Sequence, residues 1–153
     1  MRYDVQVDVE APAEVLWSVV ADPSQWPLIS DSFIKVAPVG DGELVVGQRY
    51  VVRQPGIRSM SWTVTEVEDG TAFTWRSSVL GIRTDGIHRV VPRGQGTSRL
   101  ELAMEQSGPL SRLVAAMGGA HYRALVDREA ATMAGAAEHR ARGDRGDDAS
   151  PTR

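Results

Sequence analysis

Two histidines are the residues of this chain best suited to proton transfer. His121 lies four residues after Met117 and four before Leu125, so the three share one face of a predicted helix. His88 stands in an apolar strand segment, and we prefer the phase that buries it because the opposite phase would bury Arg89 without a partner. A neutral imidazole accepts a proton at one nitrogen and donates a hydrogen bond from the other. We therefore name His121 and His88 as candidate catalytic residues.

Each histidine also has a purely structural interpretation. A histidine in a strand is often a hydrogen-bonded core or surface residue, and His88 is open to that interpretation. His121 could simply bond to a backbone carbonyl or a buried water across the gap between helix and sheet. Substitution of His121 by Phe would separate the two interpretations, because it keeps a ring and removes both nitrogens.

Other classes of active site are disfavoured by the residues present. The three histidines, His88, His121 and His139, lack the spacing of metal ligands, and the chain has no cysteine. A GxSxG nucleophile elbow is missing, and the glycine-rich stretch GDGELVVG lacks the lysine of a phosphate-binding loop. We therefore expect no metal and no cofactor, so that any chemistry is that of a cofactor-free pocket.

The predicted inner face of the sheet combines aromatic and methionine side chains with a few polar groups. Apolar walls with sparse polar groups are typical of small-molecule pockets. The candidate ligand-binding residues are Tyr50, Gln54, Met60, Trp62, Trp75, Ser77, Met104, Gln106 and Met117. The alternative is an ordinary filled core in which the same side chains only pack.

The elements that must position these residues follow from periodicity and turn signals. Alternation in residues 3–10 predicts a half-buried strand, Pro12 suits the first turn of a helix, and Asp22-Pro23 ends that helix and begins a second short turn. Turn signals recur at Gly40-Asp41-Gly42, Pro55-Gly56, Asp69-Gly70, Gly81 and Gly94-Gln95-Gly96. They divide the chain after residue 33 into strand-length segments, which predicts an antiparallel meander.

A long amphipathic helix is predicted over roughly residues 109–140, because apolar residues recur there at helical spacing. Gly118-Gly119 would kink this helix or bring it close to another backbone. The charged residues 141–153 lack aromatics and periodicity, which predicts a disordered tail. We therefore expect one domain in residues 1–140, followed by that tail.

Charge and hydropathy bound the partners and the compartment. The formal net charge is −3, and no basic block stands out before the tail, so a nucleic-acid surface is disfavoured. The start of the chain, MRYDVQVDVE, is unlike a signal peptide, and no run approaches the about 18 apolar residues of a membrane span. We expect a cytoplasmic protein with no membrane span, whose partner is a hydrophobic or aromatic small molecule.

Several stretches carry a family likeness. APAEVLWSVVADPSQWP, GQRYVVRQPG, WTVTEVEDGTAFTW and GTSRLELAMEQSGPL resemble the START-related helix-grip superfamily (SRPBCC), in its bacterial polyketide cyclase/dehydrase-like branch. The resemblance covers nearly all of residues 1–140. It implies an α+β helix-grip fold with a seven-stranded curved antiparallel sheet and two short helices after the first strand. A long C-terminal helix would cover the concave face, and Trp17 and Trp26 would close one end.

The resemblance leaves two functions open. One is a cofactor-free cyclase or dehydrase acting on a polyketide-like intermediate in a cavity of about a few hundred Å³. The other is a non-catalytic carrier or sensor of lipid-like or aromatic molecules. Members of the aromatase/cyclase subgroup typically have an arginine-containing cavity, whereas Arg49 and Arg53 are predicted to face outward here.

Overall fold

Seven antiparallel strands form a single sheet in the computed structural model, which describes residues 1–147. The strands are β1 (Arg2–Val9), β2 (Lys35–Val39), β3 (Arg49–Arg53), β4 (Met60–Glu68), β5 (Ala72–Val79), β6 (Ile82–Gly94) and β7 (Thr97–Ser107). Their order is β1-β7-β6-β5-β4-β3-β2, so β2 to β7 form a meander and β1 joins its far edge. The predicted helix-grip sheet is confirmed.

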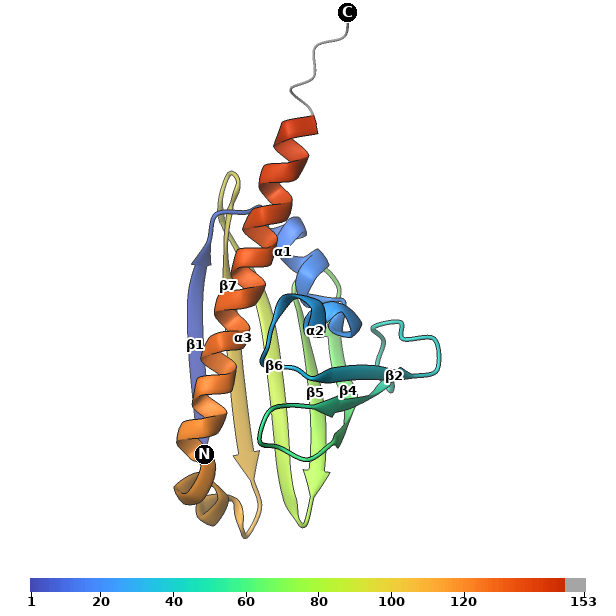
Figure 1. The fold of residues 1–153 in the computed structure, drawn as a ribbon, viewed down its shortest axis with the longest axis vertical. Coiled ribbons are helices and arrows are strands. Elements are labelled where there is room, and N and C mark those ends of the chain that lie inside the picture. Colours follow the sequence, from blue (N-terminus) through green and yellow to red (C-terminus); the bar gives the residue numbers. More distant parts are fainter. Residues whose placement is uncertain (148–153) are drawn as a thin grey trace, which may run out of the picture.

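The helices lie on one side of this sheet (Figure 1). Helix α1 (Ala13–Val20) and helix α2 (Trp26–Ile29) follow β1, with the short 3-10 helix η1 (Pro23–Gln25) between them. Helix α3 (Ser111–Asp147) runs along the sheet and packs against β1, β7 and α1. None of the helices within residues 1–147 is long and apolar enough to cross a membrane.

Helix α3 is assigned as one helix from Ser111 to Asp147, so Gly118-Gly119 does not end it. It also extends to Asp147, and Ala141 is buried at 3% exposure, so the predicted tail boundary is wrong for residues 141–147. A small side chain such as alanine lets the helix approach α1 closely. The rest of the predicted tail, residues 148–153, lies outside the described residues.

Alternation along the strands turns one face of the sheet toward the helices. In β7, Leu100, Leu102 and Met104 are buried, as the period of two predicts. In β6, His88 and Val90 are buried, which confirms the preferred phase of that strand. Register shifts in β4–β5 and β6–β7 mark bulges, which bend a sheet locally. The concave face therefore collects aromatic and polar side chains such as Trp62, Trp75 and His88.

Trp26 closes one end of this concave face. It is completely buried, and its indole N–H donates a hydrogen bond to the carbonyl of Val19 at 3.1 Å. Its ring lies 5.2 Å from the ring of Phe33 and 5.2 Å from that of Trp75, measured between centroids. Trp17 is only half-buried at the margin of the core. The closing role therefore belongs mainly to Trp26.

Candidate functional site

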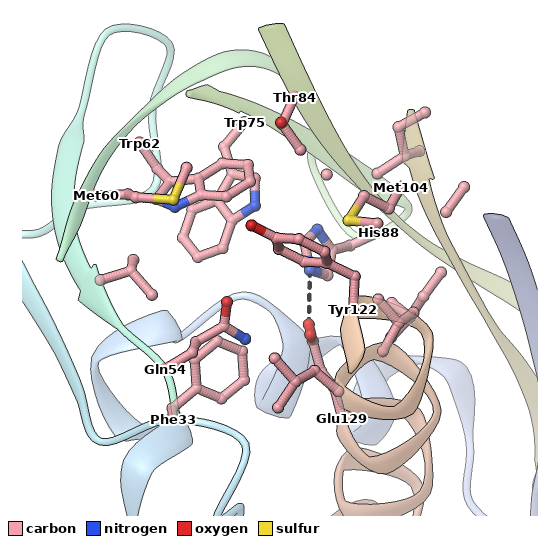
Figure 2. A pocket seen from close by; sticks show the side chains of 17 residues that line it. Phe33, Gln54, Met60, Trp62, Trp75, Thr84, His88, Met104, Tyr122 and Glu129 are labelled. Carbon is pink, nitrogen blue, oxygen red and sulfur yellow. Dashed lines mark hydrogen bonds and ion pairs between the residues drawn. The ribbon is translucent and has the colours of Figure 1, made fainter. Parts of the chain in front are cut away.

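A cavity lies between α3 and the concave face of the sheet (Figure 2). Its enclosed part has a volume of about 60 Å³, and the hollow reaches about 650 Å³ when the space open to solvent is included. The lining residues are Phe33, Val52, Gln54, Met60, Trp62, Trp75, Thr84, Gly86, Ile87, His88, Leu102, Ala103, Met104, Tyr122, Leu125, Val126 and Glu129. The enclosed volume suits about four to six waters, so the predicted volume of a few hundred Å³ is wrong for this part.

Gly86 lets the indole of Trp75 lie directly against β6 at the wall of the cavity. It occupies an inward position of β6, paired with Trp75 on β5 and Met104 on β7. A Cβ atom at position 86 would lie 2.5 Å from Nε1 of Trp75, so any larger residue would require the indole to move. A glycine inside a strand often marks such a close approach.

The chemically distinctive feature of the cavity is a buried pair formed by His88 on β6 and Glu129 on α3. Nε2 of His88 lies 3.0 Å from Oε1 of Glu129 (Figure 2). Both residues are buried, at 3% and 7% exposure. The imidazole ring also stacks on Phe73, with 4.3 Å between centroids and 4° between the planes. Strand, helix and stacked ring together fix the orientation of the imidazole.

This pairing determines which nitrogen of His88 is available for chemistry. An ionised carboxylate only accepts hydrogen bonds, so Nε2 carries a proton and donates a hydrogen bond to Glu129. Nδ1 is buried and has no hydrogen-bond partner among residues 1–147. With Nε2 as the donor, Nδ1 of a neutral ring is an acceptor. The arrangement can therefore take up a proton at Nδ1, and Glu129 would stabilise the resulting imidazolium.

Glu129 was missed by the sequence analysis, although a signal was present. Leu125, Glu129, Met133 and Ala137 follow one another at intervals of four residues, and all are buried in α3. A carboxylate within an apolar stripe needs a partner. The pattern could therefore have identified Glu129 as a candidate, but not His88 as the residue that meets it.

His121 and Met117 do not line the cavity, contrary to the prediction. His121 is exposed, and its Nε2 donates a hydrogen bond to the carbonyl of Pro55 at 2.8 Å. Met117 is 82% exposed. The physical reason is that α3 packs against β1 and β7, so its face toward β3 and β4 meets only the loop after β3. His121 thus makes a hydrogen bond to a backbone carbonyl, as its structural interpretation expects.

The other predicted residues divide into three groups. Gln54, Met60, Trp62, Trp75 and Met104 line the cavity. Ser77 and Gln106 are buried on the concave face but do not border the cavity. Tyr50 is also buried outside the lining, and its hydroxyl donates a hydrogen bond to the carbonyl of Gly42 at 3.0 Å. Burial raises the pKa of Tyr50.

Tyr122 is a lining residue that the sequence analysis did not select. It follows His121 in α3, and Figure 2 shows its hydroxyl pointing into the cavity toward Met60 and Trp75. It is half-buried, as suits an aromatic residue at a cavity mouth. Tyr122, Leu125, Val126 and Glu129 recur at i, i+3, i+4 and i+7, so a helical stripe counted from Tyr122 could have identified it.

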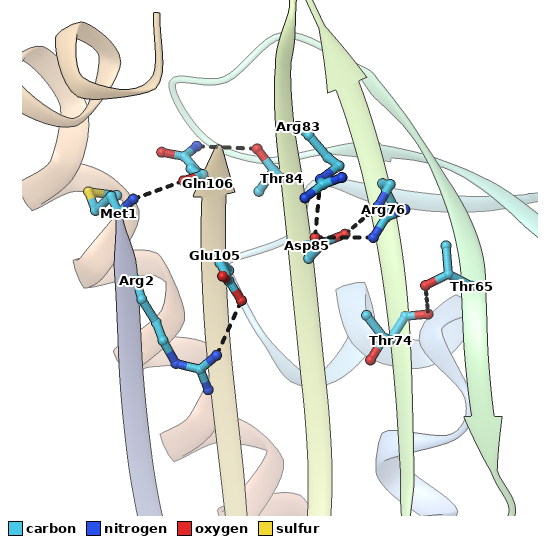
Figure 3. Close-up of polar contacts among 10 residues, drawn as sticks. All are labelled: Met1, Arg2, Thr65, Thr74, Arg76, Arg83, Thr84, Asp85, Glu105 and Gln106. Carbon is cyan, nitrogen blue, oxygen red and sulfur yellow. Dashed lines mark hydrogen bonds and ion pairs between the residues drawn. The ribbon is translucent and has the colours of Figure 1, made fainter. Parts of the chain in front are cut away.

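The arginines of the central strands lie on the convex face, as predicted for strand arginines. Arg76 donates to Asp85 at 2.6 Å, and Arg83 lies 3.6 Å from the same carboxylate (Figure 3). The hydrogen bond that Arg76 donates to the carboxylate of Asp85 raises the pKa of Arg76. Within residues 1–147, no arginine borders the cavity, and no group of three histidine or acidic side chains could hold a metal ion.

Comparison with known proteins supports a family and a fold. The family model described as polyketide cyclase/dehydrase and lipid transport matches residues 1–138. No curated protein matches the chain by sequence. Among the solved structures similar to it is a norcoclaurine synthase from Thalictrum flavum, with 20% identity and a TM-score of 0.65, covering 91% of this chain and 84% of that one. Another is an aromatase/cyclase from a Streptomyces species, with 18% identity and a TM-score of 0.67, covering 93% of each chain. A protein from Nitrosospira multiformis has 19% identity and a TM-score of 0.66, covering 86% of this chain and 94% of that one. At these identities the likeness shows the fold alone.

Proposed function

Because the chain belongs to the polyketide cyclase/dehydrase and lipid transport family, we propose that its cavity binds small aromatic or polyketide-like carbonyl compounds and that the His88–Glu129 pair transfers a proton there. The observation that carries this proposal is the buried, hydrogen-bonded pair beside an apolar hollow. Gln54, Met60, Trp62, Trp75 and Met104 supply the walls that would hold the ligand.

The first step is the removal of a proton from the carbon next to a ligand carbonyl. Nδ1 of His88 takes the proton, the C–H electron pair forms the enolate, and the imidazolium is stabilised by Glu129. The hydroxyl of Tyr122 points into the cavity and can donate a hydrogen bond to the enolate oxygen. Proton abstraction of this kind needs no cofactor.

Ring closure follows when the same ligand carries a second carbonyl within reach. The enolate carbon attacks that carbonyl carbon, His88 returns its proton to the new alkoxide, and loss of water completes the dehydration. Confinement of a flexible chain in a bent conformation supplies much of the rate, because the two reacting carbons are held together. Apolar walls on both sides of the hollow would impose this conformation.

The second candidate function is binding without chemistry. The lining is mostly apolar, and the family description includes lipid transport. A carrier would use the same walls and would not need His88 to change its protonation state. Under this alternative, the pair with Glu129 serves stability and ligand orientation only. The net charge of −3 supports a small-molecule partner rather than nucleic acid in either case.

The two functions are separated by hydrogen–deuterium exchange at a ketone. Acetophenone is incubated with the protein in D₂O, and loss of its methyl proton signal is followed by NMR. We expect the wild type to accelerate this exchange and His88→Gln to reduce it by roughly 10²–10⁴-fold, the usual contribution of a general base. Glutamine keeps a donor for Glu129, so the fold is preserved.

His121→Phe is the matched control, because His121 lies outside the cavity and should leave the exchange rate unchanged. Binding of acetophenone is measured in parallel by calorimetry. Binding without accelerated exchange would contradict proton transfer and leave the carrier function. Absence of binding would contradict the proposal for the cavity itself.

A further inference from the structure

Three polar side chains form a row across the concave face. Along β6, this row and the His88–Glu129 pair lie on opposite sides of Gly86. Ser77 on β5 pairs with Thr84 on β6, and Thr84 pairs with Gln106 on β7. Paired positions on neighbouring antiparallel strands share a face of the sheet. All three are buried, at 2%, 5% and 4% exposure. Polar groups so deeply buried normally have hydrogen-bond partners.

The row has unused hydrogen-bonding capacity. Gln106 Nε2 donates to Thr84 Oγ1 at 3.3 Å (Figure 3), which occupies a lone pair of Thr84 and leaves the hydroxyl proton to be directed elsewhere. Within the described part of the chain, Ser77 Oγ has no partner. Ser77 does not border the cavity, whereas Thr84 does, so it is the hydroxyl of Thr84 that can donate to an incoming acceptor atom. Gln106 acts through Thr84, as a positioning residue.

One residue of this row, Thr84, can contact a ligand in the cavity. Thr84 borders the cavity, and His88 lies four residues further along the same strand, at a distance of about 13 Å along β6. The inward position between them is Gly86, flanked by Trp75 and Met104. The hollow thus has polar groups at both ends and flat, apolar walls between them.

We propose that Thr84, held in place by Gln106, forms a specificity subsite for a ligand oxygen, placed at the end of the molecule opposite the carbonyl that meets His88. The proposal rests on the proposed function of the cavity. The ligand class it names is an aromatic ketone with a hydroxyl or second carbonyl at its far end. An apolar group in the same place would leave the hydroxyl proton of Thr84 without an acceptor, which a site built for an oxygen disfavours.

The test compares two probes of the same shape. 4-Hydroxyacetophenone carries an oxygen at the far end, and 4-methylacetophenone carries a methyl group there. We expect calorimetry to give the wild type an affinity for the hydroxyl probe at least about tenfold higher. Thr84→Val should bring the affinity ratio close to one, and Gln106→Leu should lower it partially. A merely structural loss would weaken both probes equally and leave this ratio unchanged.

Ser77→Ala is the matched control, because Ser77 is buried in the same row but does not border the cavity. A wild-type ratio near one, or a ratio that survives Thr84→Val, would overturn the subsite while leaving the cavity proposal intact. A lower melting temperature of the free variants with an unchanged ratio would assign the row to a structural water and also overturn it. If neither probe binds, the proposed function itself fails, and the subsite fails with it.

Discussion

The imidazole of His88 and the carboxylate of Glu129 each depend on the other for a hydrogen-bond partner. Each is buried among apolar groups, where a polar side chain without a partner destabilises the fold. Removing one member leaves the other uncompensated, whereas replacing both by apolar groups of similar shape removes the problem. The stability of the fold and the proposed proton transfer would therefore depend on the same 3.0 Å contact.

The first prediction concerns the coupling within this pair. His88→Phe should lower the free energy of unfolding by about 3 kcal/mol, because it leaves the carboxylate of Glu129 buried and unpaired. The double variant His88→Phe/Glu129→Leu should lose less than the sum of the two single variants, by about 1–3 kcal/mol. Urea denaturation of all four proteins measures this difference. Strict additivity would show that the contact contributes little.

The second prediction concerns alkaline pH. Burial raises the pKa of Tyr50 above the ordinary value of 10.0, so the folded protein retains the phenol proton at a pH where the unfolded chain loses it. The stabilising contribution is complete below about pH 10 and is lost as the pH rises from there toward the raised pKa. Denaturation at a series of pH values should show this fall, and Tyr50→Phe should reduce it. An equal fall in the variant would contradict the assignment.

At the scale of elements, helix α2 matters for the position of one side chain rather than for its length. It spans only Trp26–Ile29, yet Trp26 contacts aromatic rings from β5 and β6 and bonds back to Val19 of α1. The short helices are thereby fixed to the sheet at the end next to His88. Trp26 should therefore contribute more to the stability of the fold than Trp17, the other tryptophan of this junction.

The third prediction compares those two tryptophans. Trp26→Ala should lower the free energy of unfolding by about 3–5 kcal/mol, because it empties a completely buried site. Trp17→Ala should cost clearly less, since Trp17 is half-buried. Guanidinium denaturation followed by circular dichroism checks both values. Equal losses would mean that exposure in the structure does not describe the packing of Trp17.

The strands and helices could be predicted because apolar residues recur in the sequence with the period of each element. The alternation in β6, for example, predicted that His88 faces inward. What periodicity does not contain is where one element lies on another. The face of α3 that carries Met117 and His121 was predicted to cover the sheet. It lies outside the cavity because α3 packs toward β1 and β7. Glu129 could not be matched with His88 for the same reason.

At the scale of the whole molecule, the shape of the cavity depends on Gly86, which has no side chain and so leaves room for the indole of Trp75. Gly86 lies between the two polar ends of the hollow and beneath the indole of Trp75. The enclosed part is only about 60 Å³, so a bound aromatic molecule must also use the part that is open to solvent. Closing the space at Gly86 should therefore affect binding and stability together.

The fourth prediction tests this with two glycine substitutions. Gly86→Ala places a methyl group 2.5 Å from Trp75 Nε1, so it should destabilise the protein by about 1–3 kcal/mol and weaken the binding of acetophenone. Gly135→Ala is the control, because a Cβ there meets no heavy atom of residues 1–147 within 4 Å. In a helix it should stabilise by up to about 1 kcal/mol. Unchanged binding in Gly86→Ala would contradict the role given to Gly86.

The pairing of β1 with β7 also governs how the chain can reach its folded state. β1 is made first during synthesis, but its partner begins at Thr97, and the terminal amino group of Met1 bonds to the carbonyl of Gln106. Strands β2 to β7 can assemble through successive local hairpins, whereas β1 must wait for a contact across most of the chain. Such distant contacts slow folding. Until β7 emerges, the apolar side of β1 is exposed, and this strand is where premature association of nascent chains would begin.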